Sequence, residues 1–474
     1  MDIYLSFLLL ILVSDVIFLT IMVIGEWGNP YRMLGYTFFI LGLPFLGFFF
    51  YLVIGQTAYN GYRQKEFGDD AENLASLAHI KFDDISDEPD EAHRQVFERM
   101  RELGGVGYSR DNEIKLYTVG QPKFEDIFAD MRAAKKFIFL EYYIIKDDFM
   151  GKTLLDILTE KAKEGLEVKL MVDDFNFGKK PKSDFNEFIA AGGEFVIFHM
   201  LWKKFFSPRK NNRNHRKVAY IDGEIAYVSG FNFGKGYVGL SWKGYWRDSA
   251  VRIRGNAVIP LGVRFCTDWE YMTGRKIERD EFHFKRTEEK PGEHSAMIFS
   301  GGPNLDVNPI VSEYLELIRM SKETLYIHSP YFNPTEEIKD ALKDAAKRGV
   351  DVRIIIPNIA DHVFVYWNNI RTADELMTSG VRYFRYTKGF VHSKTVVTDS
   401  EYCSVGSANF NPRSINLDFE TNVFIASKDF GKQMYDAFLE DLEDCYEYTP
   451  EMYQKDRKEN GLRLWIARMF AYFV

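Results

Sequence analysis

The stretch Asn214-His215-Arg216-Lys217-Val218-Ala219-Tyr220-Ile221-Asp222 has a second copy in the same chain, Val391-His392-Ser393-Lys394-Thr395-Val396-Val397-Thr398-Asp399. Both copies follow the pattern His-x-Lys-x4-Asp. An asparagine follows each histidine at the same spacing, as Asn232 and Asn409, within a run of small residues. A lone copy would be weak evidence, because short patterns arise by chance and suit half-buried strands without chemistry. Two copies with the same spacing predict two related halves that contribute to the same reaction.

The residue types of the two motifs suit the chemistry of a phosphate diester. Alternate side chains of a strand point to the same face, so each His-x-Lys pair is expected to share one pocket. A histidine, with an ordinary pKa of about 6.5, serves as a neutral nucleophile or as a charged acid. Lysine and asparagine donate hydrogen bonds to anionic oxygens, which phosphoryl-transfer transition states require. We expect no metal, because the motifs lack the ligand spacings of zinc sites.

The paired motifs resemble the duplicated signature of the phospholipase D superfamily. Further stretches are similar to its bacterial-type cardiolipin synthases: Gly244-Tyr245-Trp246-Arg247-Asp248, Asp361-His362-Val363-Phe364-Val365-Tyr366-Trp367, Gly389-Phe390-Val391-His392-Ser393-Lys394 and Gly406-Ser407-Ala408-Asn409-Phe410-Asn411-Pro412-Arg413-Ser414. The resemblance extends from the N-terminal apolar stretches almost to the C-terminus. One departure is Gly234-Lys235-Gly236-Tyr237, where the family commonly has Gly-Asp-Glu-Tyr.

The resemblance implies a role for each motif residue. The catalytic set that it implies is His215, Lys217, Asp222, His392, Lys394 and Asp399. Asn232, Asn409 and Ser407 are expected to bind the substrate phosphate and its transition state. Asp248 and Glu420 are expected to hydrogen-bond the catalytic imidazoles and fix their tautomer, as the acid of a catalytic triad does. We therefore interpret Asp222 and Asp399 as more structural than chemical.

The activity that the resemblance implies is cardiolipin synthesis by phosphatidyl transfer. His215 is provisionally the nucleophile that attacks phosphatidylglycerol, while His392 protonates the departing glycerol. The phosphatidyl-histidine then passes its lipid to a second phosphatidylglycerol, and no cofactor is required. The opposite assignment of the histidines stays open, as does phosphatidylethanolamine as the second substrate. His328 is interpreted as a core histidine, and His362 as a candidate contact to substrate or lipid.

Strand-like and helix-like segments alternate in both halves, which predicts an α/β fold of βαβ units. The resemblance implies that the two phospholipase D-like halves share one active site at their interface. The predicted division is a transmembrane hairpin over 1–60, a charged linker with a helix over 61–110, a first half over 111–280, a link over 281–294, a second half over 295–448 and a C-terminal segment with an interfacial amphipathic helix over 449–474.

Two N-terminal stretches, 3–24 and 33–55, are almost continuously apolar and long enough to cross a hydrocarbon layer of about 30 Å. They predict a multi-pass membrane protein, and the resemblance implies that the membrane is the bacterial cytoplasmic membrane. A signal peptide is the weaker alternative, because a basic n-region and a cleavage site are missing. Arg63 and Lys65 follow the second stretch, which favours a catalytic part that faces the cytoplasm. Asp15 is expected to face the second helix or to be neutral.

The amino-acid composition limits the kinds of partner that the protein is expected to bind. The 474 residues carry a net charge of −9, so no basic field indicates nucleic acid. An aromatic share of 16% suits lipid contact, and three cysteines without CxxC spacing suit a reducing compartment. Phosphatidylglycerol, cardiolipin and an anionic lipid surface are the expected partners, and a homo-oligomer is left open. The basic, aromatic stretch 202–210 suits a membrane surface or a solvated loop equally. The segment 462–474 suits an interfacial helix, with docking onto the protein core as the alternative.

Three other functions compete with cardiolipin synthesis. A membrane phospholipase D that hydrolyses or exchanges headgroups would use the same residues. A nuclease is disfavoured by the membrane spans and the acidic balance. A catalytically inactive scaffold is disfavoured because the histidines and lysines of both motifs are intact.

Overall fold

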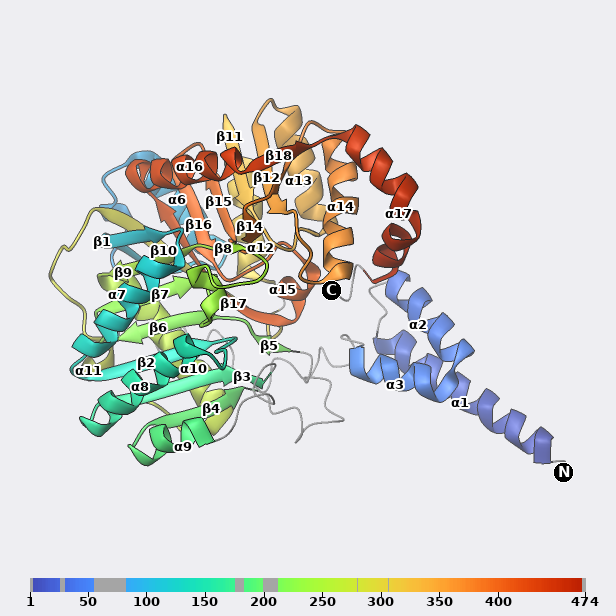
Figure 1. Ribbon diagram of the computed structural model, residues 1–474, viewed down its shortest axis with the longest axis horizontal. Coiled ribbons are helices and arrows are strands. Elements are labelled where there is room, and N and C mark those ends of the chain that lie inside the picture. The colour runs from blue at the N-terminus through green and yellow to red at the C-terminus, as the bar shows by residue number, and fades with distance from the viewer. Residues whose placement is uncertain are drawn as a thin grey trace. The chain divides into compact units, whose positions relative to one another are not determined.

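The computed structural model describes residues 3–25, 30–54, 82–174, 183–198, 212–278, 280–305 and 307–470. The chain forms two compact units. The smaller unit contains the N-terminal apolar helices, and the larger unit contains both motif-bearing halves (Figure 1). The basic stretch 202–210, the linker residues 61–81 and the last residues, 471–474, lie outside the described residues.

The smaller unit has three described helices, α1 (Ile3–Gly25), α2 (Pro30–Gly42) and α3 (Pro44–Ile54). In the described part of the chain, α1 is the one helix with the length and hydropathy to cross a membrane. The predicted second span over 33–55 is not one continuous helix, because the stretch is divided between α2 and α3. Proline lacks a backbone N–H and its ring clashes with the preceding turn, so Pro44 ends one helix and begins the next.

Helix α3 folds back against α2 instead of extending it. The ring centroids of Tyr36 in α2 and Tyr51 in α3 lie 5.1 Å apart, whereas one straight helix would separate these residues by about 22 Å. Gly47 permits the close approach, because a Cβ there would lie 2.2 Å from the carbonyl oxygen of Phe39. Phe18 of α1 stacks on Phe48 of α3 at 4.0 Å between centroids. The three helices thus pack as one cluster.

The larger unit is built on a 16-stranded sheet to which both halves contribute. The first half supplies β1 (Val106–Tyr117), β2 (Phe137–Tyr142), β3 (Glu167–Asp173), β4 (Glu194–Phe198), β6 (Lys217–Ile221), β7 (Ile225–Ser229) and β9 (Ala250–Arg254), with helices α7 (Gly120–Ala133), α8 (Phe149–Lys163), α9 (Ser183–Ala190) and α10 (Ile259–Thr273). The second half supplies β10 (His294–Gly301), β11 (Thr324–His328), β12 (Asp351–Pro357), β13 (Arg382–Tyr386), β15 (Thr395–Thr398), β16 (Tyr402–Gly406), β17 (Asp418–Ala426) and β18 (Cys445–Tyr448), with helices α12 (Pro309–Met320), α13 (Glu336–Lys347), α14 (Val363–Met377) and α16 (Lys428–Glu443).

The strand order repeats outward from the antiparallel pair β1–β10 at the middle of the sheet. On one side the order is β9, β7, β6, β2, β3, β4, and on the other it is β17, β16, β15, β11, β12, β13. In each half an antiparallel hairpin, β6–β7 or β15–β16, follows the motif histidine, and parallel strands form the outer part. The predicted pair of similar α/β halves is confirmed.

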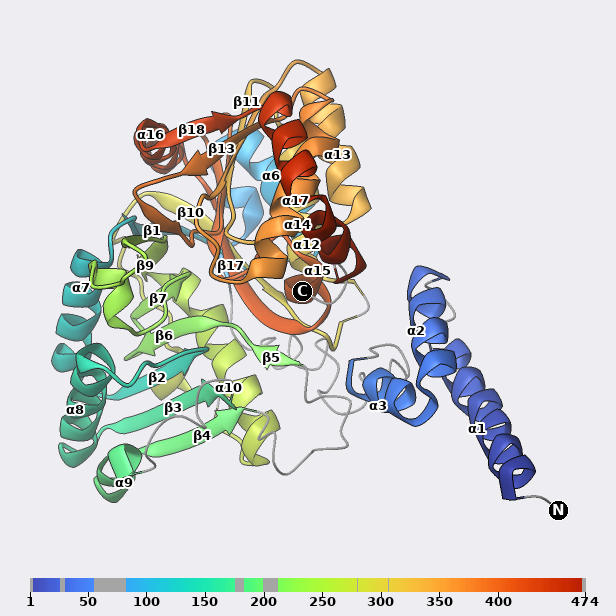
Figure 2. The ribbon, with the colours of Figure 1, turned by 45° about the vertical axis from the view of Figure 1, so that its right-hand side comes forward.

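Helices cover both faces of each half. Helices α7 and α8 lie on one face of the first-half strands and α10 lies on the other (Figure 2). The alternation along β2 explains this, since Ile138 and Leu140 belong to the core that α7 and α8 cover, while Phe139 stacks on Phe265 of α10 at 4.9 Å. In the second half, α12, α13 and α14 cover one face, and Tyr326 of β11 stacks on Phe438 of α16 across the other.

The structure adds detail to three of the predicted segments. The charged linker over 61–110 contains α6 (Glu91–Glu102) near its expected place, but Phe97 and Met100 of that helix are buried in the core of the second half. The link over 281–294 begins with α11 (Glu281–Phe284), whose Phe284 packs on the protein, so the extended connection starts after it. The C-terminal helix α17 (Pro450–Phe470) docks onto the second half, as the alternative reading expected. Patterns of charge predicted the helices but not their burial.

The docking of α17 is specific. Leu464 and Ala467 are buried in the second-half core, and the guanidinium of Arg463 lies 5.9 Å from the ring centroid of Trp367 in α14. On the same helix, Leu462 and Trp465 are exposed. The buried face of α17 thus matches the alternative of docking onto the protein core, and an interfacial role for its exposed face stays a prediction.

Candidate active site

The two motif histidines sit where short strands of one half pair with the other half. Strand β5 (Arg213–Asn214), just before His215, pairs with β17 of the second half. Strand β14 (Gly389–Val391), just before His392, pairs in parallel with β8 (Tyr245–Arg247) of the first half. The backbone N–H of His215 donates to the Phe419 carbonyl at 3.0 Å, and that of His392 donates to the Arg247 carbonyl at 2.7 Å. Each histidine is thus held by backbone of the opposite half.

The carboxylates that contact the imidazoles are also exchanged between the halves. His215 Nδ1 lies 2.9 Å from Glu420 Oε1 and 3.0 Å from Oε2. His392 Nδ1 lies 2.7 Å from Asp248 Oδ2. Both carboxylates are fully buried, so each fixes its imidazole with Nδ1 toward the acid and leaves Nε2 for chemistry. Sequence order suggested no such crossing, because each acid follows the histidine of its own half.

Two buried lysines accompany the histidines. Lys217 Nζ donates to the His215 carbonyl and lies 5.2 Å from the ring centroid of Tyr143. Lys394 Nζ donates to the His392 carbonyl. Both lysine side chains are at most 1% exposed. The alternation expected of His-x-Lys is therefore present, and each ammonium is held beside its own histidine.

Burial and charge set the protonation of this site. Burial lowers the pKa of Lys217 to about 7 and that of Lys394 to about 8, although Glu420 and Asp248 oppose the change. Burial, then Lys217 and Lys394, holds the pKa of His215 well below its ordinary value. Burial and Lys394 also lower the pKa of His392, but Asp248 counteracts them. The two lysines beside the two histidines make a pocket suited to an anion, which favours the charged form of each lysine when it binds.

The asparagine of each motif has a local partner. Asn232 Oδ1 accepts from the Ile144 N–H at 3.1 Å, and its Nδ2 donates to the Tyr237 hydroxyl at 3.1 Å. Asn409 Nδ2 donates to Ser414 Oγ at 3.2 Å. An amide nitrogen carries two hydrogens, so each Nδ2 has a second hydrogen available for an anionic oxygen.

Ser407 departs from its expected role as a phosphate ligand. Its hydroxyl donates to Glu420 Oε2 and accepts from the Thr421 N–H at 3.0 Å. A hydroxyl has one hydrogen, and here Glu420 takes it. Ser407 therefore positions the carboxylate that contacts His215.

The motif aspartates lie at the far ends of their strands from the histidines, in tight turns. Asp222 accepts from the backbone N–H groups of 135, 136 and 137, and Asp399 accepts from those of 322, 323 and 324. Both aspartates have a positive φ, 56° and 53°. These contacts agree with the interpretation of both aspartates as more structural than chemical. They anchor the start of β2 and β11, because each half-buried carboxylate accepts three backbone hydrogen bonds there.

An aromatic wall surrounds His392, and the motif pattern did not predict it. The rings of Trp246, Phe390, Tyr237 and Tyr331 lie 5.8, 6.0, 6.0 and 6.2 Å from the imidazole. His215 has Tyr143 at 4.7 Å. Trp246 and Phe390 lie within stretches that resemble the family, so the resemblance could have indicated that these two aromatic residues belong to the site. The wall excludes water from one side of the site.

Two buried ion pairs tie the motifs to the surrounding protein. Arg216 pairs with Asp268 and donates through Nε to Thr421 Oγ1 at 3.1 Å. Arg247 pairs with Asp441 of α16 at 2.7 Å, and His328 Nε2 lies 3.1 Å from the same carboxylate. His328 is buried and its Nδ1 contacts Thr395 Oγ1 at 2.9 Å, which is the environment of a core histidine.

The remaining candidates lie apart from the motif residues. His362 precedes α14, is well exposed and lies 6.3 Å from the Tyr331 ring. Among the described residues, one group has the geometry to hold a metal ion, Asp90, His93 and Glu401, and it includes no motif residue. His93 Nε2 already contacts Glu401 at 2.8 Å, and Asp90 caps the first turn of α6. We interpret this group as a polar contact that holds α6 against the second half.

Comparison with known proteins assigns the chain to a family. The family model described as "Cardiolipin synthase, PLD-like domain" matches residues 127–249 and 314–442. The crystal structure of phosphatidylserine synthase from Haemophilus influenzae Rd KW20 aligns with a TM-score of 0.58 over 76% of this chain and 95% of that chain, at 16% identity, and shows the same fold. The fold and the doubled site therefore define a phospholipase D-like enzyme with both half-sites on one chain.

The nearer relatives narrow this class. Cardiolipin synthase 1 of Staphylococcus epidermidis is 38% identical over 427 residues, which cover 88% of this chain and 87% of the relative. The cardiolipin synthase of Listeria welshimeri is 37% identical over 457 residues, with coverage of 94% and 95%. The chain belongs to the bacterial cardiolipin synthase family.

Proposed function

We propose that this protein is a phosphatidyltransferase that converts two molecules of phosphatidylglycerol into cardiolipin and glycerol. The observation that carries the proposal is the pair of imidazoles, each held at Nδ1 by a buried carboxylate of the opposite half, with a buried lysine beside each. Two such histidines supply a nucleophile and an acid, and the lysines supply the charge that a phosphate diester needs. The family membership supports the same reaction.

In the first step, His215 Nε2 attacks the phosphorus of phosphatidylglycerol. The bond to the glycerol oxygen breaks, and His392 Nε2 donates its proton to that oxygen, so glycerol leaves and a phosphatidyl-histidine remains. In the second step, His392 removes the proton from a primary hydroxyl of another phosphatidylglycerol. That oxygen attacks the phosphorus, the bond to His215 breaks and cardiolipin leaves. No net oxidation occurs, and the reaction is reversible.

The electrostatics of the two histidines favour this division of roles. The pKa of His215 is held well below its ordinary value, which keeps the imidazole neutral and nucleophilic. The pKa of His392 is lowered by burial and by Lys394, but Asp248 raises it, which favours proton transfer in both directions. Lys217, Lys394, Asn232 and Asn409 are proposed to hold the non-bridging oxygens, and Asp248 and Glu420 to orient the imidazoles.

We also propose a bacterial cytoplasmic membrane location, with α1 as the anchor and the catalytic unit in the cytoplasm. The length and hydropathy of α1 support the anchor. The proposed partners are phosphatidylglycerol, cardiolipin and the anionic membrane surface. Protease protection of the larger unit in inverted and right-side-out membrane vesicles tests the orientation. Digestion of that unit only in inverted vesicles is expected, and digestion only in right-side-out vesicles would contradict it.

The reaction is tested by mass-spectrometric analysis of products from purified protein in phosphatidylglycerol vesicles. The wild type is expected to release cardiolipin and glycerol, whereas His215→Ala and His392→Ala are expected to release neither. Acid quenching with labelled lipid should trap phosphatidyl-histidine at His215. A label at His392 alone would reverse the two roles. Phosphatidic acid without cardiolipin would instead favour a membrane phospholipase D that hydrolyses headgroups.

A further inference from the structure

Residues 234–246 form a loop, here called the rim loop, with one side on the active site and the other side exposed. On the inner side, the rings of Tyr237 and Trp246 belong to the wall around His392. On the outer side, Leu240 is 60% exposed and Trp242 is 90% exposed. No other large apolar side chain in the described part of the chain is as exposed as Trp242. Leaving an indole in water is unfavourable, because transfer of a large apolar side chain out of water lowers the free energy.

The exposure of Trp242 follows from bonds that hold the rim loop in place. The Lys235 N–H donates to Asp148 Oδ2 at 2.8 Å, and Trp246 Nε1 donates to Ser241 Oγ at 3.1 Å. Lys243 Nζ donates to the Ala360 carbonyl of the second half at 3.2 Å. The rim loop therefore has both ends and its tip tied down, and the tip presents Trp242 outward.

The rim loop contacts a second segment that carries an exposed apolar residue. Ala360, which accepts from Lys243, precedes α14, whose first residue, Val363, is 60% exposed. His362 lies between them, exposed, and its ring is 6.3 Å from that of Tyr331 in the His392 wall. Both halves thus contribute an exposed apolar residue whose sequence neighbour, Ser241 or His362, approaches a ring of the wall around His392.

The charge of the rim loop indicates what covers it. Its sequence contains two lysines, Lys235 and Lys243, and no acidic residue. Lys243 Nζ lies 5.2 Å from the Trp242 ring. Tryptophan beside lysine is the composition of segments at the headgroup level of an anionic bilayer, where the ring is partly buried and the ammonium meets lipid phosphate. A basic apolar tip therefore suits an anionic bilayer, where the lysines meet lipid phosphates and the apolar side chains enter the headgroup region.

We propose that the rim loop inserts Trp242 and Leu240 into the headgroup region of an anionic bilayer and so admits the lipid headgroup to the wall around His392. This inference rests on the proposed function, because only a site that takes its substrate from a bilayer needs such a surface at its mouth. The α1 helix keeps the chain at the membrane, whereas the rim loop sets how the catalytic site meets it.

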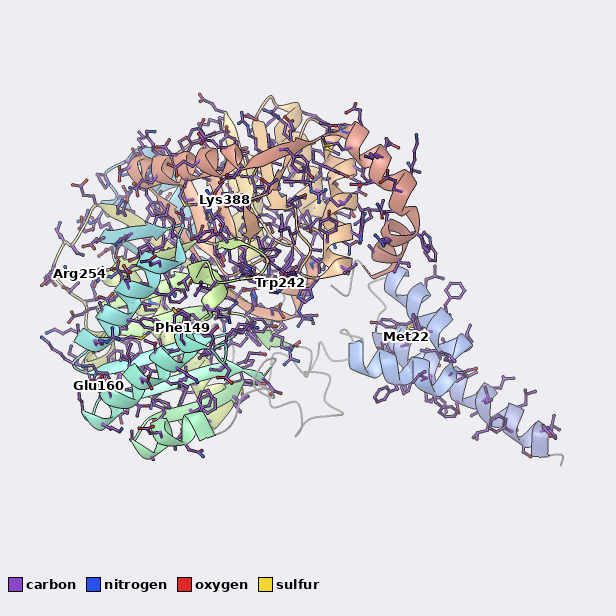
Figure 3. The ribbon with its side chains drawn as sticks, viewed as in Figure 1. Met22, Phe149, Glu160, Trp242, Arg254 and Lys388 are labelled. Atoms are coloured by element: carbon purple, nitrogen blue, oxygen red, sulfur yellow. The ribbon has the colours of Figure 1, made fainter. Side chains whose placement is uncertain are left out.

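The depth of the rim loop can be measured in the full chain, reconstituted in vesicles of phosphatidylglycerol and phosphatidylcholine. Trp242→Cys carries an environment-sensitive NBD label in a Cys445→Ser background, since Cys266 and Cys403 are buried. The matched control is Arg254→Cys, which Figure 3 shows on a different part of the larger unit. Quenching by spin-labelled lipids is expected at 242 and not at 254. No quenching at 242 would overturn the proposal, as would a blue shift that lipid quenchers leave untouched, because that result indicates a protein partner.

Activity gives the second test. In a Leu240→Ser/Trp242→Ala variant, cardiolipin formation from long-chain phosphatidylglycerol vesicles is expected to fall about 5- to 20-fold. Formation from dispersed short-chain phosphatidylglycerol should stay within about twofold of the wild type, and Trp242→Phe should restore most of the vesicle activity. Equal losses on both substrates would assign the loop to the shape of the His392 wall and overturn the proposal. A wild type that forms no cardiolipin from either substrate would instead refute the proposed function. The lipid-quenching experiment would then still test whether the rim loop inserts into the bilayer.

Discussion

At the scale of single residues, the chemistry depends on carboxylates that cross between the halves. A carboxylate at Nδ1 fixes the tautomer of an imidazole and stabilises its protonated form. Glu420 does this for His215, and Ser407 in turn holds Glu420. Asp248 does it for His392. Removing either acid should leave the substrate pocket in place while impairing proton transfer and nucleophilic attack.

We predict that Asp248→Asn and Glu420→Gln lower kcat by about 10²- to 10⁴-fold, with KM for phosphatidylglycerol changed only a few-fold. Rapid-quench experiments should show slower formation of phosphatidyl-histidine in Glu420→Gln, because that acid orients the proposed nucleophile. Asp399→Asn serves as the control, since its carboxylate holds a turn. It should lower the melting temperature and leave kcat within a few-fold. A kcat loss in Asp399→Asn as large as in Asp248→Asn would contradict this assignment.

The motif lysines predict an alkaline limit to activity. Both ammonium groups are charged below their pKa values, about 7 for Lys217 and about 8 for Lys394, and lose the proton as pH rises through them. Since kcat/KM reports the free enzyme and both charged lysines are proposed to be needed, it should begin to fall above pH about 7. The alkaline decrease of kcat should occur at higher pH than that of kcat/KM, because a bound phosphate anion raises the pKa values of both lysines. A value of kcat/KM that stays constant up to about pH 9.5 would contradict the prediction, and Lys394→Arg, which stays charged, should weaken the alkaline decrease.

At the scale of the elements, hydrophobic runs predicted where apolar segments lie but not how long each helix is. The stretch 33–55 is apolar throughout, so hydropathy reads it as one span. Pro44 breaks it, and Gly47 lets the second piece pack on the first. Similarly, the charge pattern of α6 predicted a solvated linker helix, yet Phe97 and Met100 on one face are buried. Which face is buried depends on a partner distant in sequence.

The fold-back of α3 onto α2 predicts a short cross-link. Cysteines at positions 36 and 51, made by Tyr36→Cys and Tyr51→Cys, should react efficiently with a bismaleimide of about 8 Å in membranes, because the tyrosine rings lie 5.1 Å apart. Tyr51→Cys with Leu34→Cys is the control, since the Leu34 side chain is exposed. A continuous helix would separate 36 and 51 by about 22 Å and give no cross-link for either pair. That outcome would restore the second span.

At the scale of the whole molecule, the halves complete each other. Strands β1 and β10 join them in one sheet, and each histidine receives backbone and carboxylate partners from the opposite half. The buried pair Arg247–Asp441 also links them, and leaving one partner of a buried pair uncompensated typically costs about 3–5 kcal/mol. Neither half holds a complete site.

We predict that fragments 1–288 and 289–474, purified separately, form no cardiolipin. The second fragment would also lack α6 and so expose part of its core. A full chain with a protease site inserted between Glu288 and Glu289, which are exposed, should stay assembled after cleavage and keep at least about half its activity. Size-exclusion chromatography and product analysis of the cleaved protein check this. Activity of either isolated fragment would show that the exchanged partners are dispensable.

The sequence by itself determined the residue types of the site, the duplication and the alternation of strands and helices, because these depend on local periodicity and on repeated motifs. It also marked Asp248 and Glu420 as partners of the histidines. Only the tertiary structure decided which acid meets which histidine, that Ser407 holds Glu420, and that Trp242 stands exposed beside the His392 wall. The reason is physical: these contacts join segments far apart in the chain, and their pairing is fixed by how the halves pack, which no local pattern of residues encodes.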